Sequence, residues 1–387
     1  MIEIRPIETR QDQESYRALA RYCFVDTTGW VDRIIPLPED LANEYGAFED
    51  GRLTTAIISY SYTCNLFSKK HPMSGIGAVA TWPQDRGRGH VRTLMHHIMR
   101  KDHGEGKTVS TLYPFKFAFY GKFGYGSIGG PAVYKLSPLD IRQLAPANGE
   151  WIIFDCSEQM LAEYKTVVSA WASQYDFACI SEDYTVGRIR GMLDFSKEHC
   201  YLFRSGGKTR AMIRYTLTVI GQHDKRLDVR KAAWTDAEGF AAIFSFLSLH
   251  RDQIPEIEWR ATRDLPVHLM TREPRIQCRL SWDWMARPLD LPRLLADRVE
   301  AEGFEGRAEL SVLDDVIESN AGAYLVEGGK VKRTGPPGEN PIDMQVLSSL
   351  LFGGMTYSEA VSAGHALSPK VQGFFSRRRP IWLSENF

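Results

Sequence analysis

The stretch that decides the fold reads Val79-Ala80-Thr81-Trp82-Pro83-Gln84-Asp85-Arg86-Gly87-Arg88-Gly89-His90-Val91. The apolar segment 73–82 predicts a β-strand, and residues 89–101 carry apolar side chains at helical spacing. A loop of the form Gln-x-x-Gly-x-Gly joins the two segments. The stretch therefore predicts a strand, a glycine-rich turn and a helix in direct succession.

Such a turn can hold a phosphate group. Main-chain N–H groups ahead of a helix point into one concavity, and the helix N-terminus adds roughly half a positive charge. Gly87 and Gly89 would let the backbone approach a diphosphate without a Cβ in the way. Arg86 and Arg88 could add charge-assisted hydrogen bonds.

Three other readings compete with a coenzyme-binding turn. The ATP-binding P-loop needs Gly-Lys-Ser/Thr at its end, which this loop lacks. The dinucleotide fingerprint needs a third glycine, which is also missing. A solvated arginine-rich turn stays open as the structural alternative, and the strand before it and the helix after it weigh against that alternative.

The rest of the chain predicts a mixed α/β protein. In the N-terminal part we expect strands at 2–6, 45–49, 53–60, 108–112 and 132–136, a helix at 11–23 and a helical turn at 115–122. A second part, with helices at 160–175 and 237–249 and strands at 201–204, 211–218, 227–233 and 256–261, repeats this order without the glycine-rich turn. We interpret it as a degenerate repeat. The third part predicts helices at 290–301, 342–352 and 356–364 and strands at 308–312, 322–327 and 330–334. The predicted domains are 1–145, 146–280 and 281–387.

Composition excludes several classes of protein. A chain of 387 residues with 43% hydrophobic and 25% charged residues is globular rather than disordered. Its net charge of -1 gives no global field for nucleic acid, so no nucleic-acid partner is expected. No apolar run reaches about 18 residues, so no membrane span is expected.

Cysteine and histidine usage indicates the compartment and the absence of a metal. Six cysteines are scattered without a CxxC pair, and ten histidines include no HExxH motif. Because the N-terminus also shows no leader, we expect a cytoplasmic protein with free thiols and no metal.

The loop at 84–89 resembles the acetyl-CoA loop of the GNAT superfamily of N-acetyltransferases. Downstream, Phe119-Tyr120-Gly121-Lys122-Phe123-Gly124-Tyr125-Gly126 resembles the "Y-x-x-F-G-Y" segment of the Eis-type (enhanced intracellular survival) members. Met285-Ala286-Arg287-Pro288-Leu289-Asp290-Leu291-Pro292 resembles the start of their C-terminal, sterol-carrier-protein-like domain. The likeness covers nearly the whole chain, although the middle part carries no motif of its own.

This resemblance implies an α/β (α+β) fold with tandem GNAT-like mixed sheets flanked by helices, and a sterol-carrier-like α+β domain at the end. It implies acetyl-CoA as co-substrate and, as acceptor, a primary amine of the aminoglycoside, polyamine or lysine type, on a small molecule or a peptide. The amine would attack directly, which agrees with the lack of a Cys or Ser nucleophile signature. Members of the family often form hexamers, so a homo-oligomer is expected.

Carried over residue by residue, the resemblance makes Tyr125 the general acid for the leaving thiolate and the C-terminal carboxylate of Phe387 the general base. Each role has a structural alternative. Tyr125 could be a packed aromatic residue beside Phe123, and the C-terminal tail could only pack its aromatic side chains. The implied coenzyme contacts are Val79, Ala80 and Thr81 for the pantetheine arm, Arg86, Gly87, Arg88, Gly89, His90, Val91 and Arg92 for the pyrophosphate, and Tyr120 and Gly121 further on.

Asp26 and Trp30 are the implied substrate residues, with a cap or turn role as the alternative for Asp26. Three phenylalanines at 115, 117 and 119 depart from the family pattern and leave the acceptor open. A second hypothesis is a non-catalytic acyl-CoA sensor or lipid carrier. The apolar runs of the last part are broken by Gly353-Gly354, which disfavours a wide lipid tunnel.

Overall fold

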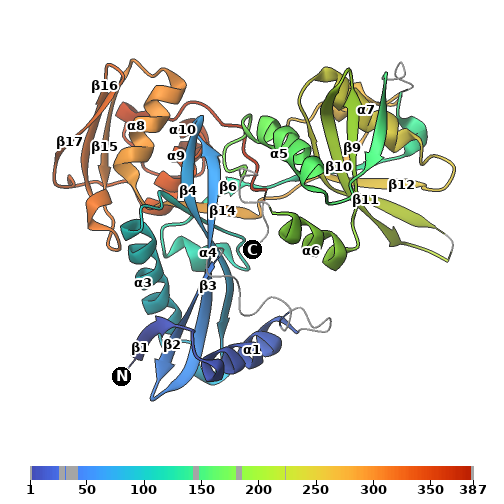
Figure 1. Ribbon diagram of the computed structural model, residues 1–387. Coiled ribbons are helices and arrows are strands. Elements are labelled where there is room, and N and C mark those ends of the chain that lie inside the picture. Colours follow the sequence, from blue (N-terminus) through green and yellow to red (C-terminus); the bar gives the residue numbers. More distant parts are fainter. Residues whose placement is uncertain are drawn as a thin grey trace. The chain divides into compact units, whose positions relative to one another are not determined.

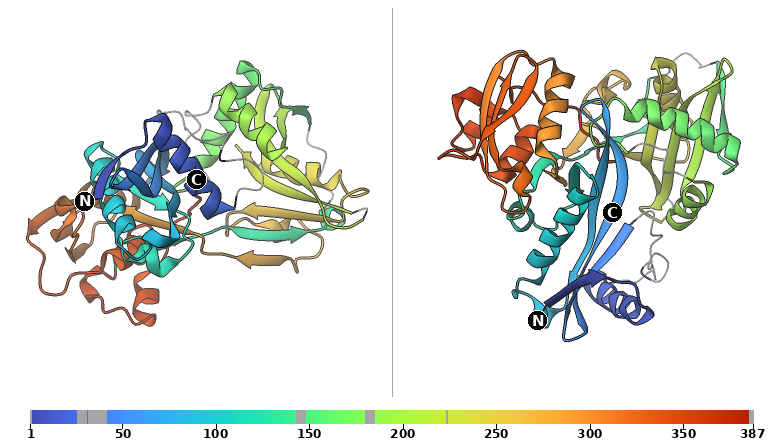
Figure 2. Two further views of the ribbon diagram at one scale, coloured as in Figure 1. Left: turned by 90° about the horizontal axis from the view of Figure 1, so that it is seen from below. Right: turned by 60° about the vertical axis from the view of Figure 1, so that its left-hand side comes forward.

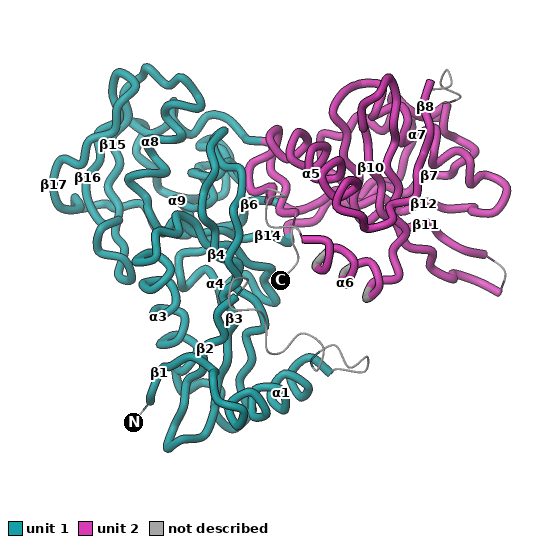
Figure 3. The backbone as a smooth tube through the Cα atoms, viewed as in Figure 1, with its two compact units in different colours: residues 1–129, 283–379, 385–387 teal, residues 130–282, 380–384 magenta. Residues whose placement is uncertain are grey.

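A computed structural model describes residues 2–25, 31, 42–142, 148–179, 185–222 and 224–384. The chain forms two compact units. One contains the residues up to Gly129 together with Asp283–Arg379, and the other contains Gly130–Trp282 and Pro380–Ser384 (Figure 3). The N-terminal sheet and the C-terminal domain thus pack within a single unit.

The first unit is built on a seven-stranded sheet of order β1-β2-β3-β4-β5-β14-β6. Its strands are β1 (Ile2–Pro6), β2 (Ala42–Glu49), β3 (Arg52–Leu66), β4 (Lys69–Thr81), β5 (Val109–Leu112), β14 (Trp284–Pro288) and β6 (Gly126–Gly129). Helices α1 (Arg10–Phe24) and α3 (His90–Gly104) lie on the two sides of this sheet (Figures 1 and 2). Only β4 and β5 run parallel, because α3 connects them as a crossover.

The second unit repeats this plan in a sheet of order β13-β7-β12-β11-β10-β9-β8. Its strands are β7 (Ala132–Leu136), β8 (Gly149–Ile153), β9 (His199–Ser205), β10 (Lys208–Val219), β11 (Lys225–Trp234), β12 (Glu256–Ala261) and β13 (Gln277–Leu280). Its helices are α5 (Glu158–Ala172), α6 (Val186–Ser196) and α7 (Ala237–Ser248). Again one neighbouring pair, β11 and β12, is parallel, and α7 connects it. The tandem α/β sheets expected from the sequence are confirmed.

Two strands are exchanged between the sheets. The strand expected to complete the N-terminal segment, β7, pairs instead with β12 and β13 of the second sheet. In the first sheet, β14 lies between β5 and β6 and pairs with both. In the sequence, β14 follows the last strand of the second sheet. The strand expected at 132–136 is confirmed, but its pairing partners belong to the second sheet. Local alternation predicts a strand but not its partner, because partner choice depends on contacts far away in the sequence.

The C-terminal part of the first unit carries a three-stranded sheet, β15 (Arg307–Val312), β16 (Gly322–Glu327) and β17 (Lys330–Gly335). The same C-terminal part contains helices α8 (Leu291–Glu302), α9 (Met344–Leu351) and α10 (Tyr357–Ser362). A buried ion pair joins this part to β14, with Arg287 Nη2 2.5 Å from the Asp314 carboxylate. Within the described ranges no helix is long and apolar enough to cross a membrane.

Candidate functional site

Strands β4 and β5 separate at one end and leave main-chain groups open. Their parallel pairing runs from Met73↔Val109 to Ile76↔Leu112 and then stops, whereas β4 continues to Thr81. Ala78, at φ 48°, marks a bulge in the pairing of β4 with β3 at this point. The segment 77–81 therefore has a free edge toward β5, to which an extended amide-bearing chain can add hydrogen bonds.

The turn after β4 leads directly into an uncapped helix. Gly87 and Gly89 have φ of 77° and 87°, and a Cβ at either position would meet no atom within 4 Å. Glycine is needed there for the left-handed backbone rather than for space. Gly89 is the N-cap of α3 and supplies no side-chain hydrogen bond, so within the described ranges no side chain caps the first-turn N–H groups of α3, which can then bind a ligand.

Ion pairs hold this turn in place. Asp85 is 1% exposed and accepts two hydrogen bonds of 2.8 Å from the guanidinium of Arg52. These bonds lower the pKa of the Asp85 carboxyl group. Arg88 donates to Glu49 at 2.6 Å and to Asp85 at 3.2 Å. The guanidinium of Arg88 thus stabilises the turn through these ion pairs. Of the groups of Arg88, the main-chain N–H is then the one left for the expected binding of the pyrophosphate.

A cleft of about 900 Å³ opens beside the turn. It is lined by Cys23, Phe24, Val79, Thr81, Asp85, Arg86, Gly87, Gly89, His90, Val91, Arg92, Phe115, Lys116, Phe119, Lys122 and Phe123. Four of these side chains are Arg or Lys, and the single carboxylate among them, Asp85, is already paired. A basic turn beside an aromatic wall suits a ligand with an anionic head and an apolar arm.

The tyrosines of the predicted motif lie in successive layers behind this cleft. Tyr120 packs edge-on against Phe115 and Phe119, at centroid distances of 5.4 and 5.1 Å. Tyr125 lies one ring further in, 6.3 Å from Tyr120, and is fully buried. Its hydroxyl group forms a 2.7 Å hydrogen bond with Ser110. Burial raises the pKa of both phenols, so both are protonated at neutral pH.

The structure brings most of the predicted coenzyme residues together but not all. Val79, Thr81, Gly87 and the start of α3 line the cleft, whereas Ala80 is buried in the core between the sheet and α1. At Gly121, a Cβ would lie 2.5 Å from the side chain of Gln345, so this position faces α9.

Three of the predicted site residues, Asp26, Trp30 and Phe387, lie outside the described residues. Sequence reasoning missed Cys23, Phe24, Lys116 and Lys122, which line the cleft from α1 and from around α4 (Phe117–Gly121). The sequence did carry one signal for this part of the cleft, since Lys116 and Lys122 lie within a strongly aromatic stretch.

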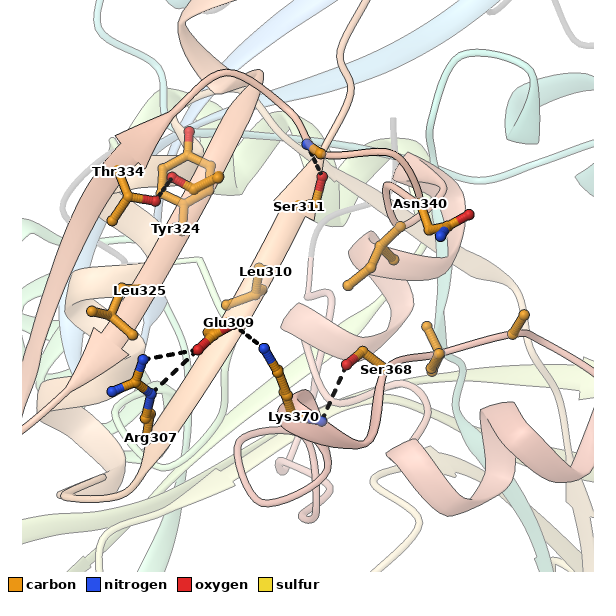
Figure 4. Close-up of a pocket in the computed structure, with 15 residues that line it drawn as sticks. Arg307, Glu309, Leu310, Ser311, Tyr324, Leu325, Thr334, Asn340, Ser368 and Lys370 are labelled. Atoms are coloured by element: carbon orange, nitrogen blue, oxygen red, sulfur yellow. Dashed lines mark hydrogen bonds and ion pairs between the residues drawn. The ribbon is translucent and has the colours of Figure 1, made fainter.

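A second cavity of about 730 Å³ lies on the outer face of the C-terminal sheet. Figure 4 shows Glu309 between Arg307 and Lys370, with which it forms ion pairs. Ser311, Thr334 and Asn340 add polar groups. The lining also contains the apolar side chains of Leu310, Leu325, Ile342 and Leu367, so the cavity combines an apolar surface with an ion-paired cluster.

Comparisons with known proteins identify the domains and the fold. Residues 3–128 and 186–288 each match a family model of an acetyltransferase (GNAT) domain, and residues 291–381 match a sterol carrier protein domain. A search of curated proteins finds no match.

Three solved structures share the fold over the whole of both chains. A GCN5-related N-acetyltransferase from Anabaena variabilis has TM-score 0.82 at 19% identity, and a probable N-acyltransferase from Enterococcus faecalis has 0.80 at 18%. Eis1 from Mycobacterium abscessus has 0.78 at 20% identity. The chain carries two GNAT acetyltransferase domains and a C-terminal sterol carrier protein domain, and together these support an N-acetyltransferase.

Proposed function

Starting from two GNAT domains, we propose that this protein transfers an acetyl group from acetyl-CoA to a primary amine in the cleft of its first unit. The observation that carries the proposal is the combination of an uncapped α3 N-terminus with the free edge of β4 in one basic, aromatic cleft. The turn would bind the diphosphate, and the edge of residues 77–81 would pair with the amides of the pantetheine arm.

The proposed reaction is direct transfer. The amine nitrogen attacks the thioester carbonyl carbon, and its proton passes to a carboxylate, for which we propose the C-terminal carboxylate of Phe387. The C–S bond then breaks, and the thiolate takes a proton from a tyrosine. Tyr125 is the acid implied by the motif. Tyr120 is the alternative, because it lies one ring closer to the cleft and its hydroxyl group makes no hydrogen bond within the described chain.

The acceptor pocket would share the aromatic wall. Phe115 is 72% exposed and Phe24 is 38% exposed, and both line the cleft. Exposed aromatic rings favour an amine that carries apolar surface next to its positive charge. We include polyamine, lysine-peptide and aminoglycoside acceptors in the proposal, with a cytoplasmic homo-oligomer as the working form.

The test is a thiol-release assay with acetyl-CoA and a panel of these amines. We expect amine-dependent release of free coenzyme A, with mass spectrometry showing one added acetyl group on the acceptor. The carrier hypothesis predicts the opposite pattern, with no turnover on any amine and retention of fatty acid or sterol. Mass spectrometry of the native protein after incubation with lipid measures that retention.

A further inference from the structure

The second sheet contains a topological copy of the coenzyme cleft. Its parallel pair β11 and β12 is in register from Arg226↔Glu256 to Val229↔Trp259, after which β11 continues to Trp234. In the first sheet, β4 likewise runs on to Thr81 past its last partner at Ile76. Residues 230–234 therefore occupy the position that 77–81 hold in the first sheet, at the free edge proposed for pantetheine.

The helix that follows this second edge is closed to a phosphate. Asp236 is the N-cap of α7, and its carboxylate accepts a 2.9 Å hydrogen bond from the Gly239 N–H. Arg210 forms an ion pair with the same carboxylate. At Gly239, a Cβ would lie 2.3 Å from the Arg210 carbonyl oxygen, so β10 packs directly on the first turn. A built-in carboxylate takes the place that an external diphosphate would need.

Tryptophan side chains fill the space between the separated strands. The residual cavity there is about 10 Å³, whereas the cleft of the first sheet measures about 900 Å³. Trp234, Trp259, Trp171 of α5 and Trp382 of the C-terminal tail line it. Trp382 is 8% exposed and packs edge-on against Trp171, with ring centroids 5.9 Å apart. The remaining space holds about one water molecule at most, so no coenzyme fits.

Main-chain hydrogen bonds fix the tail in this place. The Asp176 N–H donates to the Pro380 carbonyl at 2.9 Å, and the Trp382 N–H donates to the Asp176 carbonyl at 2.9 Å. The Cys179 N–H donates to the Ser384 hydroxyl at 2.8 Å. Leu383 is 2% exposed. The tail is therefore bound as an added extended segment, with Trp382 as its apolar anchor.

We propose that this filled cleft of the second unit is the socket of the C-terminal tail, and that Trp382 is a positioning residue for the terminal carboxylate. Chain geometry limits the distance from Ser384 to the end of the chain, three residues on, to roughly 10 Å. A socket at residues 380–384 thus restricts the volume that the carboxylate of Phe387 can reach. The catalytic part of this inference rests on the proposed function, whereas the socket does not.

The first experiment tests the socket without any activity measurement. Carboxypeptidase digestion, followed by mass spectrometry, measures how fast C-terminal residues are released from the full chain. We expect Trp382→Ala to raise this rate at least about tenfold, because the tail loses its anchor. Trp382→Phe should keep most of the protection. Trp282→Ala is the matched control, since Trp282 belongs to the same unit but is 47% exposed.

If Trp382→Ala does not fold, Ser384→Ala tests the same socket by removing the acceptor of the Cys179 N–H. Faster tail release in that variant supports the socket. A tail released from Trp382→Ala, or from Ser384→Ala in its place, no faster than from the parent chain overturns it.

The second experiment tests positioning by steady-state kinetics on the same variants. We expect Trp382→Ala to lower kcat by about tenfold or more with the KM for acetyl-CoA unchanged, and Trp382→Phe to restore kcat. If the tail is released faster in Trp382→Ala but kcat stays at the parent value, the socket stands and the positioning role is refuted. If the parent chain has no transferase activity, the proposed function fails while the digestion result still decides the socket.

Discussion

At the scale of single residues, the open question is which phenol donates the proton to the departing thiolate. The motif points to Tyr125, but its hydroxyl group is fully buried and bonded to Ser110. Tyr120 lies between Tyr125 and the rings that line the cleft. The resemblance to the family motif pointed to this tyrosine-bearing segment, and side-chain packing separates its two tyrosines.

We predict that replacing the true acid by phenylalanine lowers kcat by about 100-fold or more, because proton donation acts only in the transition state. The affinity for acetyl-CoA should not change. Steady-state kinetics and calorimetric binding on Tyr125→Phe and Tyr120→Phe measure both quantities. Tyr134→Phe, a buried tyrosine of the second unit, is the control. If both test variants retain full kcat, no tyrosine of this segment is the acid.

The glycines of the turn offer a prediction with a control beyond the other end of the same helix. Gly87→Ala and Gly89→Ala each place a Cβ at positive φ, which costs roughly 1–2 kcal/mol. Gly106→Ala carries the same strain at φ 83°, just beyond the other end of α3, and also meets no atom within 4 Å.

All three glycine variants should lose similar thermal stability, but only Gly87→Ala and Gly89→Ala should weaken coenzyme A binding, by about tenfold. Calorimetry and thermal unfolding give the two readouts. Equal affinity in the three variants would remove the turn from the binding site.

At the scale of elements, the two crossover helices share a topology but differ at their first turns. Helix α3 begins at an uncapped glycine, whereas α7 begins at Asp236, whose carboxylate caps it. A cap satisfies the same N–H groups that a phosphate would bind, so the two uses exclude each other.

We therefore predict one coenzyme A per chain in isothermal titration calorimetry. Asp236→Ala should lower stability by about 1 kcal/mol through loss of the cap. It should not create a second binding site, because tryptophans still fill the space between β11 and β12. A stoichiometry of two in the parent protein would contradict the assignment of the second cleft as closed.

At the scale of the whole molecule, a buried histidine links the first sheet to the C-terminal domain. His71 of β4 is fully buried, with Nδ1 3.0 Å from the Thr108 hydroxyl and Nε2 3.5 Å from the Asp297 carboxylate on α8. Burial lowers the pKa of His71 to about 4, and the attraction of Asp297 opposes this only in part. Lys69 and Arg293 also face this site and favour the neutral ring.

The sign of the pH effect follows from that lowered pKa. The unfolded histidine, with a pKa of about 6.5, takes up a proton before the folded one does. The contribution of neutral His71 to the free energy of unfolding is therefore fully present above pH 6.5. It is lost as the pH drops toward 4, by up to roughly 3 kcal/mol. Urea unfolding of the parent and of His71→Asn at pH 7 and pH 4.5 measures it. The variant should show a smaller loss on acidification, and an identical loss would refute the assignment.

The sequence alone determined the features that depend on neighbouring residues. Strand alternation, helical spacing and the glycines of the turn are local signals, and with them the first coenzyme-type turn could be predicted. The degenerate character of the second segment was also visible, because no glycine-rich turn precedes the helix at 237–249.

Only the tertiary structure decided the features that depend on distant partners. It placed β7 and β14 in each other's sheets, turned the Arg88 guanidinium onto Glu49, and packed Trp382 against Trp171 beside β11 and β12. These choices follow from strand pairing, ion pairing and burial between residues tens to hundreds of positions apart. Such contacts leave no period in the sequence, because their free energy is gained only after the chain has closed the intervening loops.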